Sequence, residues 1–347
     1  MQKNNNIRNF TQPELVTVLE EMGQKKFRSK QVFEWLWKQH TLDFEQMSNL
    51  AKDLRDLLKE KFVTEPVTID QVRASSDGTR KYIFRLADGN EVEGVLIPTP
   101  TRVTACVSSQ AGCSLSCKFC ATGYLDLKKN LAHYEIYDQV QLLNKESELH
   151  FDRPITNIVY MGMGEPLLNY KNVLRSIEII TSPAGMNMSP RRITVSTAGI
   201  AKMIKKLGDD DARFEFALSL HAANDEKRNQ IMPINEHNSL EALGEALRYF
   251  YEKTKTRVTL EYCIFKDLND SKQDALELAE FARTVPSKIN IIEYNPISEA
   301  NFLNTTSQKM DEFVQVLYAK GHIVNLRRSR GKDIDGACGQ LALKTRK

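Results

Sequence analysis

Apolar residues recur at helical spacing through residues 12–61. The segment "TQPELVTVLEEMG" (11–23) begins with Thr11, a residue type that caps helices, and closes at Gly23. "SKQVFEWLWKQH" (29–40) and "MSNLAKDLRDLLKEKF" (47–62) keep apolar residues at the same helical spacing. This pattern predicts a small, all-helical module of about three helices.

After residue 66 the pattern changes from helical spacing to alternation. In "VTIDQVRASSDGTRKYIFRLADGNEVEGVLIP" (67–98), apolar and polar residues alternate in short runs. The turn-forming sequences Asp-Gly at 77–78 and Asp-Gly-Asn at 88–90 interrupt the alternation. This arrangement predicts a layer of β-hairpins.

From residue 103 onward, predicted strands alternate with predicted amphipathic helices. Strands that alternate with helices form right-handed βαβ units around a parallel sheet. About six such units favour a barrel or partial barrel over a doubly wound sheet. The strands are expected at 103–108, 155–161, 191–197, 214–220, 257–265, 288–294 and 322–328, and the helices at 133–149, 170–181, 239–254, 272–284 and 307–320.

In such a barrel the catalytic residues lie at the carboxyl ends of the strands. The unusual residues of this chain fall at those positions. They occur in "GCSLSCKFCATG" (112–123), "MGMGEP" (161–166), "STAG" (196–199), "LHA" (220–222) and "NP" (295–296).

The composition is that of an ordinary soluble globular protein, with 41% hydrophobic and 27% charged residues among 347. No apolar run approaches the ~20 residues of a membrane-spanning helix, and residues 1–15 lack the apolar core of a secretory signal. We therefore expect no membrane partner and a cytoplasmic location. There thiols stay reduced, and clustered cysteines are more often ligands or catalysts than disulfides.

The net charge of +3 is too small to indicate nucleic-acid binding, but the basic residues are unevenly distributed. From Asn325 to Lys347, seven Lys or Arg residues accompany two acidic residues. "KKFRSKQVFEWLWKQH" (25–40) interleaves cations with aromatic residues. An ordinary solvated face would explain either stretch, so charge alone does not identify a partner.

Three of the six cysteines lie within one loop, with the spacing C-x3-C-x2-C. A structural zinc site would need a fourth ligand, which no second cysteine pair supplies. A [4Fe–4S] cluster suits thiolates, and with three protein ligands it leaves one iron open for the amine and carboxylate of a methionine group. Incidental cysteines or a redox loop are the alternatives.

This spacing, with Phe119 before the last cysteine, resembles the radical S-adenosylmethionine (radical SAM) signature. The resemblance implies one [4Fe–4S] cluster on Cys113, Cys117 and Cys120, with S-adenosylmethionine (SAM) at the open iron. Reduction there would split SAM into methionine and a 5′-deoxyadenosyl radical.

The same resemblance implies a SAM site on this rim of the barrel. Gly164 and Glu165 look like the family's "GEP" motif, in which glycine allows close approach and the carboxylate binds the methionine amino group. Polar residues at later strand ends suit hydrogen bonds to ribose, adenine or carboxylate, although each alone is typical of a turn or a cap. These residues are Ser196, Ser219, Leu220, His221 and Asn295.

The other three cysteines occur in different settings. Cys263, in "LEYCIF", is typical of a small buried apolar residue. Cys338, in "GACGQL", lies between glycines on a cation-rich segment, where exposure and nearby arginines favour the thiolate and a role as nucleophile. Cys106 precedes the cysteine loop in "ACVSSQAGC".

An ordered set of motifs makes the resemblance specific. "VEGVLIP", "ACVSSQAGCSLSCKFCATG", "NIVYMGMGEPLLN", "ITVSTAG", "LSLHAANDEKR", "EYNPI" and "GACGQL" resemble the bacterial dual-specificity ribosomal RNA (adenine-C2)-methyltransferase family over nearly the whole chain. The resemblance implies methylation of one adenine in the peptidyl transferase region of 23S rRNA and of adenine 37, next to the anticodon, in some tRNAs.

The resemblance also implies an α/β fold with three parts. Residues 1–65 would form a small helix–hairpin–helix-like RNA-binding domain, and residues 66–102 a β-hairpin extension that carries Glu93. Residues 103–347 would form a radical SAM partial (βα)6 barrel that ends in the segment with the catalytic Cys338.

The family route uses two SAM molecules per turnover. Cys338 takes a methyl group from the first by nucleophilic substitution. The radical from the second removes hydrogen from this S-methyl group, the carbon radical adds to adenine C2, and Glu93 removes the C2 proton. Cys106 then attacks Cys338, and a transient disulfide forms as methylated RNA leaves. An electron donor such as flavodoxin or ferredoxin and a thiol reductant are implied partners.

Glu93 is assigned as the base by the resemblance, and Glu91 is its neighbouring competitor. Residues two apart in a strand share a face, so periodicity does not choose between them. Without the resemblance, Glu93 would be interpreted as a surface carboxylate.

An RNA substrate gives the basic stretches a role, because the target base must be unstacked and carried into the barrel. Cations and an aromatic residue of the N-terminal module would contact the RNA backbone and bases. They are Lys25, Lys26, Arg28, Lys30 and Trp35, with Arg327, Arg328 and Arg330 in the same role at the end of the barrel.

Three other functions stay open at this point. The related antibiotic-resistance methyltransferase modifies carbon 8 of the same adenine, and "CATGYLDLKKNL" is similar to it, whereas "VEGVLIP" favours carbon 2. An iron–sulfur RNA-binding or sensing protein would need no methyl-accepting thiol. A radical enzyme that acts on a small metabolite would not need the basic N-terminal module.

Overall fold

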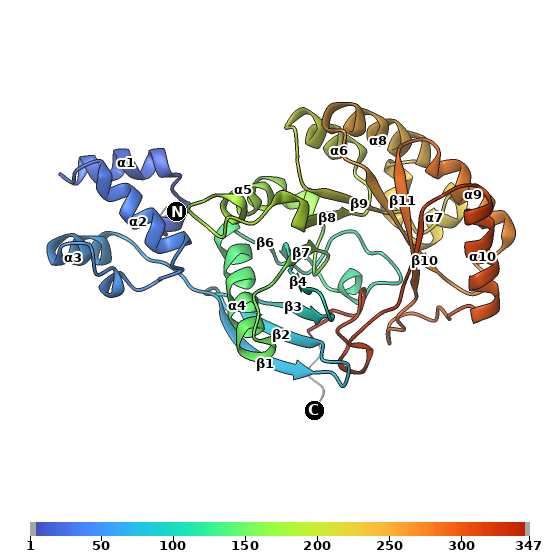
Figure 1. Ribbon diagram of the computed structural model, residues 1–347, viewed down its shortest axis with the longest axis horizontal. Coiled ribbons are helices and arrows are strands. Elements are labelled where there is room, and N and C mark those ends of the chain that lie inside the picture. The colour runs from blue at the N-terminus through green and yellow to red at the C-terminus, as the bar shows by residue number, and fades with distance from the viewer. Residues whose placement is uncertain (1–4, 344–347) are drawn as a thin grey trace.

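The computed structural model describes residues 5–343, and its N-terminal part is a separate group of helices (Figure 1). Helix α1 starts with a capping box, in which the Thr11 side chain accepts the Glu14 N–H and the Glu14 carboxylate accepts the Thr11 N–H. Residues 344–347 of the basic C-terminal stretch lie outside the described residues. The elements η1 (Ile7–Asn9), α1 (Gln12–Glu21), α2 (Phe27–Trp37), η2 (Phe44–Gln46) and α3 (Lys52–Lys61) confirm the predicted helical module.

The main sheet has ten strands in the order β1-β2-β3-β4-β7-β8-β9-β10-β11-β12. The first three pairings are antiparallel and the next six are parallel. The strands are β1 (Thr68–Ala74), β2 (Arg80–Arg85), β3 (Glu91–Pro98), β4 (Val103–Cys106), β7 (Asn157–Tyr160), β8 (Ile193–Thr197), β9 (Glu215–Ser219), β10 (Val258–Ile264), β11 (Ser287–Glu293) and β12 (Val324–Arg327), with β5 (Gln110–Ala111) and β6 (Lys129–Asn130) in a separate pair.

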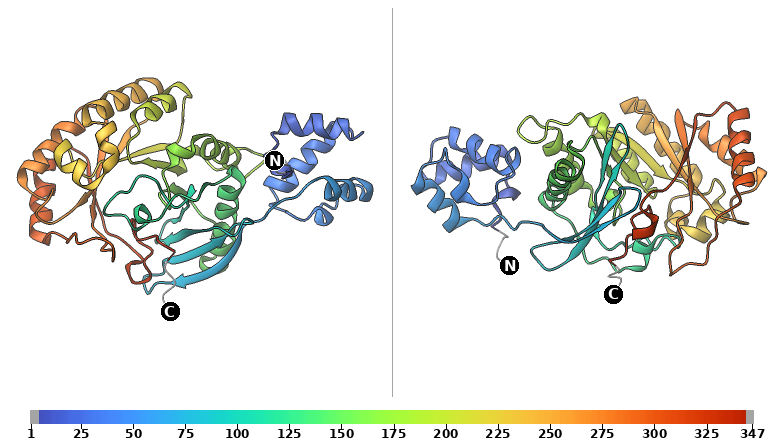
Figure 2. Two further views of the ribbon diagram at one scale, coloured as in Figure 1. Left: turned by 180° about the vertical axis from the view of Figure 1, so that it is seen from behind. Right: turned by 60° about the horizontal axis from the view of Figure 1, so that its bottom comes forward.

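Helices connect the parallel strands and lie on the outer side of the sheet, as Figures 1 and 2 show. In the described part of the chain the sheet stays open, because β1 and β12 form its two edges. This arrangement confirms the predicted α/β partial barrel. The helices are α4 (His133–Phe151), α5 (Tyr170–Thr181), α6 (Ala201–Asp209), α7 (Asp225–Ile231), α8 (Leu240–Thr254), α9 (Lys272–Ala282) and α10 (Ser307–Ala319), of which α6 and α7 lie outside the predicted set. Across residues 5–343, no helix has the length and apolar character of a membrane span.

The predicted hairpin layer is continuous with the barrel, since β3 pairs with β4. A side chain at Gly94 of β3 would lie 2.7 Å from the Phe84 ring and 3.5 Å from Leu143 of α4. This face of β3 is therefore packed against α4. Because neighbouring strand residues point to opposite faces, Glu93 is directed to the interior of the barrel.

A buried ion pair joins the N-terminal helices to α4. The Arg8 guanidinium donates to the Asp138 carboxylate over 2.6 Å, and both side chains are fully buried. His40 Nε2 lies 2.9 Å from the same carboxylate, and the Val67 N–H donates to it over 3.2 Å. Burial would raise the pKa of Asp138, but the Arg8 charge and the His40 bond outweigh burial and lower that pKa.

We expect Asp138→Ala to destabilise the protein by about 3–5 kcal/mol, because it leaves the Arg8 charge buried and unpaired. Urea unfolding at neutral pH measures this. The difference shrinks as the pH falls below about 4, where Asp138 of the unfolded wild-type chain takes up a proton, and the contribution of the charge is lost as the pH falls through the lowered pKa of the folded carboxylate. Glu280→Ala removes an exposed pair with Arg283 and should cost less than about 1 kcal/mol. An equal loss of unfolding free energy in both variants would contradict the role of the Arg8–Asp138 pair in joining the N-terminal helices to α4.

Candidate functional site

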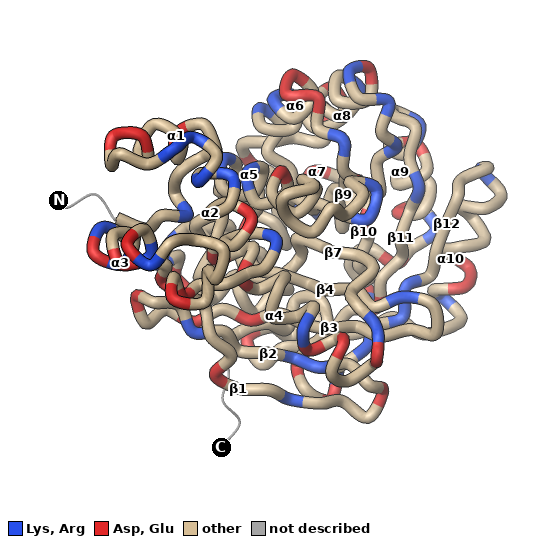
Figure 3. Tube along the Cα trace, turned by 60° about the vertical axis from the view of Figure 1, so that its left-hand side comes forward, with Lys and Arg blue, Asp and Glu red and all other residues tan. Residues whose placement is uncertain are grey.

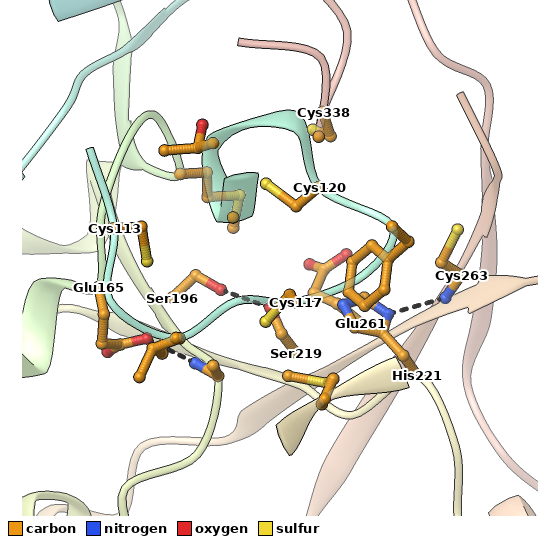
Figure 4. Close-up of a pocket in the computed structure, with 18 of the residues that line it drawn as sticks. Cys113, Cys117, Cys120, Glu165, Ser196, Ser219, His221, Glu261, Cys263 and Cys338 are labelled. Carbon is orange, nitrogen blue, oxygen red and sulfur yellow. Dashed lines mark hydrogen bonds between the residues drawn. The ribbon is translucent and has the colours of Figure 1, made fainter. Parts of the chain in front are cut away.

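The cysteine loop and the later strand ends surround one pocket inside the barrel (Figure 4). Strands β7 to β11 contribute residues from their carboxyl ends, as expected for this fold. Three predicted site residues, Cys106, Glu93 and Leu220, are not part of its wall. The predicted residues that do line it are Cys113, Cys117, Cys120, Gly164, Glu165, Ser196, Ser219, His221, Asn295 and Cys338.

Glycines give the cysteine loop its tight shape. Side chains at Gly112, whose φ is +80°, and at Gly123 would approach backbone carbonyl oxygens to 2.0 and 2.6 Å. The Ala121 N–H donates to the Gly339 carbonyl over 2.7 Å, which ties the loop to the C-terminal segment. The folded loop therefore brings its three thiols to the pocket together with that segment.

The three thiols fit an iron–sulfur cluster. Their sulfur atoms are arranged around a common space in Figure 4. Burial raises the pKa of Cys113 to about 11, and it raises the pKa of Cys117 and of Cys120 as well, so binding a metal centre must displace protons. Within residues 5–343, no three His, Cys, Asp or Glu side chains converge on a single metal ion. A cluster binds each cysteine through a different iron, so its ligands need not converge on one point.

Glu165 is buried and held by backbone groups. The Leu167 N–H donates to one carboxylate oxygen over 3.0 Å and the Ala198 N–H to the other over 2.7 Å. Burial nevertheless raises the pKa of Glu165. Gly164 has a φ of +94°, and a side chain there would come within 2.4 Å of Gln110. A cationic group in the pocket would stabilise the buried carboxylate, as the predicted methionine amino group would do.

Ser196 and Ser219 lie side by side at the ends of β8 and β9, with their hydroxyl oxygens 3.3 Å apart. His221 follows with a φ of +58°, and its Nδ1 accepts the Cys263 N–H over 3.0 Å. Burial lowers the pKa of His221 to about 3, so the ring is neutral. Leu220 is fully buried behind the wall. The two serines and the histidine can therefore bind a ligand directly, whereas the Leu220 side chain supports the wall.

The segment with Cys338 forms the opposite side of the pocket. Asn295 Nδ2 donates to the Cys338 carbonyl over 3.1 Å. The Asn295 Oδ1 atom is buried and has no hydrogen-bond partner among the described residues. Cys338 is the exposed one of the free cysteines in residues 5–343. It combines access to solvent with a position beside the thiols of the cysteine loop, as a nucleophile requires.

A second pocket adjoins the first and contains both Cys106 and Cys338. Cys106 ends β4 and is buried. Burial, together with the neighbouring Cys338, raises the pKa of Cys106 to about 12, although the Arg327 guanidinium acts to lower it. Both cysteines are free thiols. Two thiols far apart in the sequence thus line the same pocket.

Glu93 is fully buried outside both pockets. Its carboxylate lies 2.8 Å from Lys81 Nζ and accepts the Ala342 N–H over 2.9 Å. Glu91 is partly exposed and pairs with Arg85 at 2.9 Å. The interpretation of Glu93 as a surface carboxylate is therefore wrong. The two glutamates share a strand but differ completely in environment.

Two buried charged residues of this site are not among those predicted from the sequence. Glu261 of β10 lines the first pocket, and its Oε2 lies 3.7 Å from Arg327 but makes no hydrogen bond within the described chain. Burial raises the pKa of Glu261. Arg228 of α7 donates to the carbonyl groups of Leu220 and Ala198, behind the wall. Glu261 is a lone carboxylate in the apolar run "RVTLEYCIF", and this pattern indicates a buried, functional residue. Arg228 lies in a charged stretch, and nothing in the sequence distinguishes it from exposed arginines.

The residues predicted to contact RNA differ in exposure. Lys25, Lys26 and Lys30 are exposed, whereas Trp35 is partly buried and donates to the Asn49 side chain over 2.6 Å. Arg327 is part of the wall of both pockets. Figure 3 shows basic and acidic residues interspersed over the N-terminal helices and the barrel.

Two family models match the chain. Residues 5–64 match the ribosomal RNA large subunit methyltransferase N-terminal domain, and residues 107–280 match the radical SAM superfamily. The two matches fall on the helical domain and on the parallel part of the barrel.

Curated relatives and a solved structure match nearly the whole chain. A probable dual-specificity RNA methyltransferase RlmN of Cytophaga hutchinsonii is 59% identical over 97% of this chain and 93% of its own. The dual-specificity RNA methyltransferase RlmN of Geotalea uraniireducens is 42% identical, with 96% of each chain covered. The crystal structure of a radical SAM methyltransferase from Sphaerobacter thermophilus superposes with a TM-score of 0.91 at 38% identity and covers 97% of this chain and 98% of its own.

Proposed function

The chain belongs to the RlmN family of radical SAM methyltransferases, and we propose that it methylates carbon 2 of adenine in two kinds of RNA. The targets are one adenine in the peptidyl transferase region of 23S rRNA and adenine 37 of some tRNAs. The dual-specificity name of the relatives supports two RNA substrates. Their RlmN name supports carbon 2 over the carbon-8 alternative.

One observation carries this proposal. The accessible Cys338 borders both the pocket of the three-cysteine loop and the pocket of Cys106. An iron–sulfur sensor has no use for a methyl-accepting thiol beside its cluster. The family model matched by the helical domain argues in the same way against a small-metabolite substrate, because it is named for ribosomal RNA. We assign residues 1–65 to RNA binding, 66–102 to the extension with Glu93 and 103–347 to the catalytic barrel.

Members of the radical SAM superfamily use an iron–sulfur cluster and SAM, which, when bound, supply a carbon-centred radical that removes a hydrogen atom. The cluster ligands are Cys113, Cys117 and Cys120. Glu165, beside Gly164, binds the methionine amino group, because its buried carboxylate needs a cation. The remaining SAM contacts are Ser196, Ser219, the Leu220 backbone, His221 and Asn295.

Cys338 acts first, as the methyl carrier, and each turnover consumes two SAM molecules. Its thiolate attacks the methyl group of the first, and the new S–C bond forms as the sulfonium S–C bond breaks. The carbon later bonds to adenine C2 and joins the protein to the RNA. Glu93 is the base that accepts the C2 proton. In the described conformation Glu93 lies beneath Ala342, so this step requires the C-terminal segment to move.

Cys106 completes the cycle as the resolving thiol. It attacks the Cys338 sulfur, so that an S–S bond forms as the S–C bond to the RNA-linked carbon breaks. That carbon takes up a proton and becomes the methyl group, and the unpaired electron that radical addition left on the ring would pass to a one-electron acceptor such as the oxidised form of the electron donor. A thiol reductant then restores both cysteines, and an electron donor such as flavodoxin or ferredoxin serves the cluster. The cytoplasm provides both, and we place the enzyme there.

The test is an assay of the anaerobically reconstituted enzyme with labelled SAM on 23S rRNA fragments and on tRNA. We expect label in both RNAs, and mass mapping should locate the methyl group at adenine C2. A labelled methyl group at carbon 8 would instead support the alternative function, methylation of adenine C8. A cluster-loaded enzyme that consumes SAM but labels neither RNA would overturn the proposal.

A further inference from the structure

Both ends of the segment that carries Cys338 are hydrogen-bonded to one buried ion pair. Lys81 Nζ of β2 lies 2.8 Å from the Glu93 carboxylate of β3, and the two side chains are 1% and 0% exposed. Lys81 Nζ donates to the Asp335 carbonyl over 3.2 Å, and the Ala342 N–H donates to Glu93 over 2.9 Å. Residues 335–342, with Cys338 near the middle, are hereafter called the Cys338 segment.

The middle of this segment is held by neutral hydrogen bonds. Asn295 donates to the Cys338 carbonyl, the Gly339 carbonyl accepts the Ala121 N–H, and the Leu341 carbonyl accepts the Thr122 hydroxyl over 2.6 Å. The bonds at 335 and 342 are charge-assisted, and such bonds are roughly twice as strong as neutral ones. Their strength therefore depends on the charges of Lys81 and Glu93.

We propose that the Lys81–Glu93 pair clamps the Cys338 segment in place for methyl transfer, with Lys81 as a positioning residue, and that proton uptake by Glu93 keeps the segment from returning once it has moved. The inference rests on the proposed roles of Cys338 and Glu93. When Glu93 accepts the adenine C2 proton, the electron pair of the C–H bond stays with the ring and the carboxylate becomes neutral. The attraction to Lys81 and to the Ala342 N–H then weakens.

This weakening gives the reaction an order. Before the segment moves off Glu93, the clamp holds Cys338 against the pocket of the cysteine loop, and while Glu93 stays charged the segment can return to that position. Once Glu93 is neutral, the segment stays free to turn the Cys338 sulfur toward Cys106, which lies in the adjoining pocket. The resolving step therefore follows deprotonation.

Hydrogen–deuterium exchange of the reconstituted holoenzyme tests the clamp without RNA or turnover. In Lys81→Met, and in Glu93→Gln, which mimics the protonated base, we expect exchange in the peptide over 335–343 to rise at least about tenfold. The double variant leaves no unpaired buried charge and should show the same rise, so it replaces Lys81→Met if that variant does not fold.

The exposed pair of Arg85 and Glu91 on the same two strands provides the matched control, with side chains 49% and 31% exposed. Arg85→Met should leave exchange in this peptide within about twofold of wild type. Methylation of Cys338 by SAM, followed by mass spectrometry, should slow on the order of 10²-fold in Lys81→Met and recover partly in Lys81→Arg.

Unchanged exchange in both Lys81→Met and Glu93→Gln would overturn the clamp, as would an equal rise in Arg85→Met. Because these measurements need no RNA, they are separable from the proposed function. If the enzyme fails to methylate RNA but shows the expected exchange, the clamp is supported and the proposed reaction is contradicted.

Discussion

Cys338→Ala should lower RNA methylation on the order of 10⁵-fold or more, as loss of other catalytic nucleophiles does, while cluster assembly is unchanged. No other described cysteine combines solvent access with a place beside Cys113, Cys117 and Cys120. The substitution leaves the backbone bonds of the segment intact, including those to Asn295 and Ala121. The pocket should therefore keep its shape and its cluster.

Iron content and the visible spectrum of the anaerobic protein measure the cluster, and transfer from labelled SAM measures the reaction. Cys338→Ser is the matched control for size, and it should be inactive too, because a hydroxyl is a far weaker nucleophile than a thiolate. Methylation of RNA at the wild-type rate in either variant would show that Cys338 has only a structural role.

Cys106→Ala should stop the reaction one step later. The protein–RNA adduct would form but would not resolve, because no thiol remains to attack the Cys338 sulfur. We expect turnover to fall below detection and a covalent complex to accumulate to about one per enzyme, since each chain can carry one RNA through Cys338. A denaturing gel with labelled RNA detects the complex.

Cys263→Ala is the control for this experiment, because Cys263 and Cys106 are both buried with 6% exposure and lose the same volume. It should release its RNA without a trapped complex. Rapid product release by Cys106→Ala would show that another thiol or water resolves the adduct.

Most elements of the barrel are predictable because their apolar residues recur at helical spacing or form an apolar run. The period over 170–181 predicts α5 at its observed bounds, and the apolar run at 257–265 predicts β10, all of whose residues are buried. The sequence does not predict that the hairpin layer is continuous with the barrel. This continuity depends on the pairing of β3 with β4, and strand pairing leaves no local pattern.

The cysteines of the site are predictable because three thiols at this spacing have few purposes other than metal binding. Glu93 is different. What distinguishes it from Glu91 is contact with Lys81 and Ala342, and Ala342 lies far away in the sequence. Arg228 is missed for the same reason, since a charged residue is interpreted as exposed until its tertiary partners are known, whereas the apolar run around Glu261 does indicate burial.

The buried pair of Arg8 and Asp138 has a consequence for how one enzyme can accept two RNAs. A helical domain fixed to α4 in this way holds a constant distance and angle between its own surface and the mouth of the barrel. If this domain binds RNA as we propose, each RNA must present its adenine at the same separation. Ribosomal and transfer RNA would then bind because they share a three-dimensional shape around the target adenine. An RNA with the right sequence but a different bend would not bind.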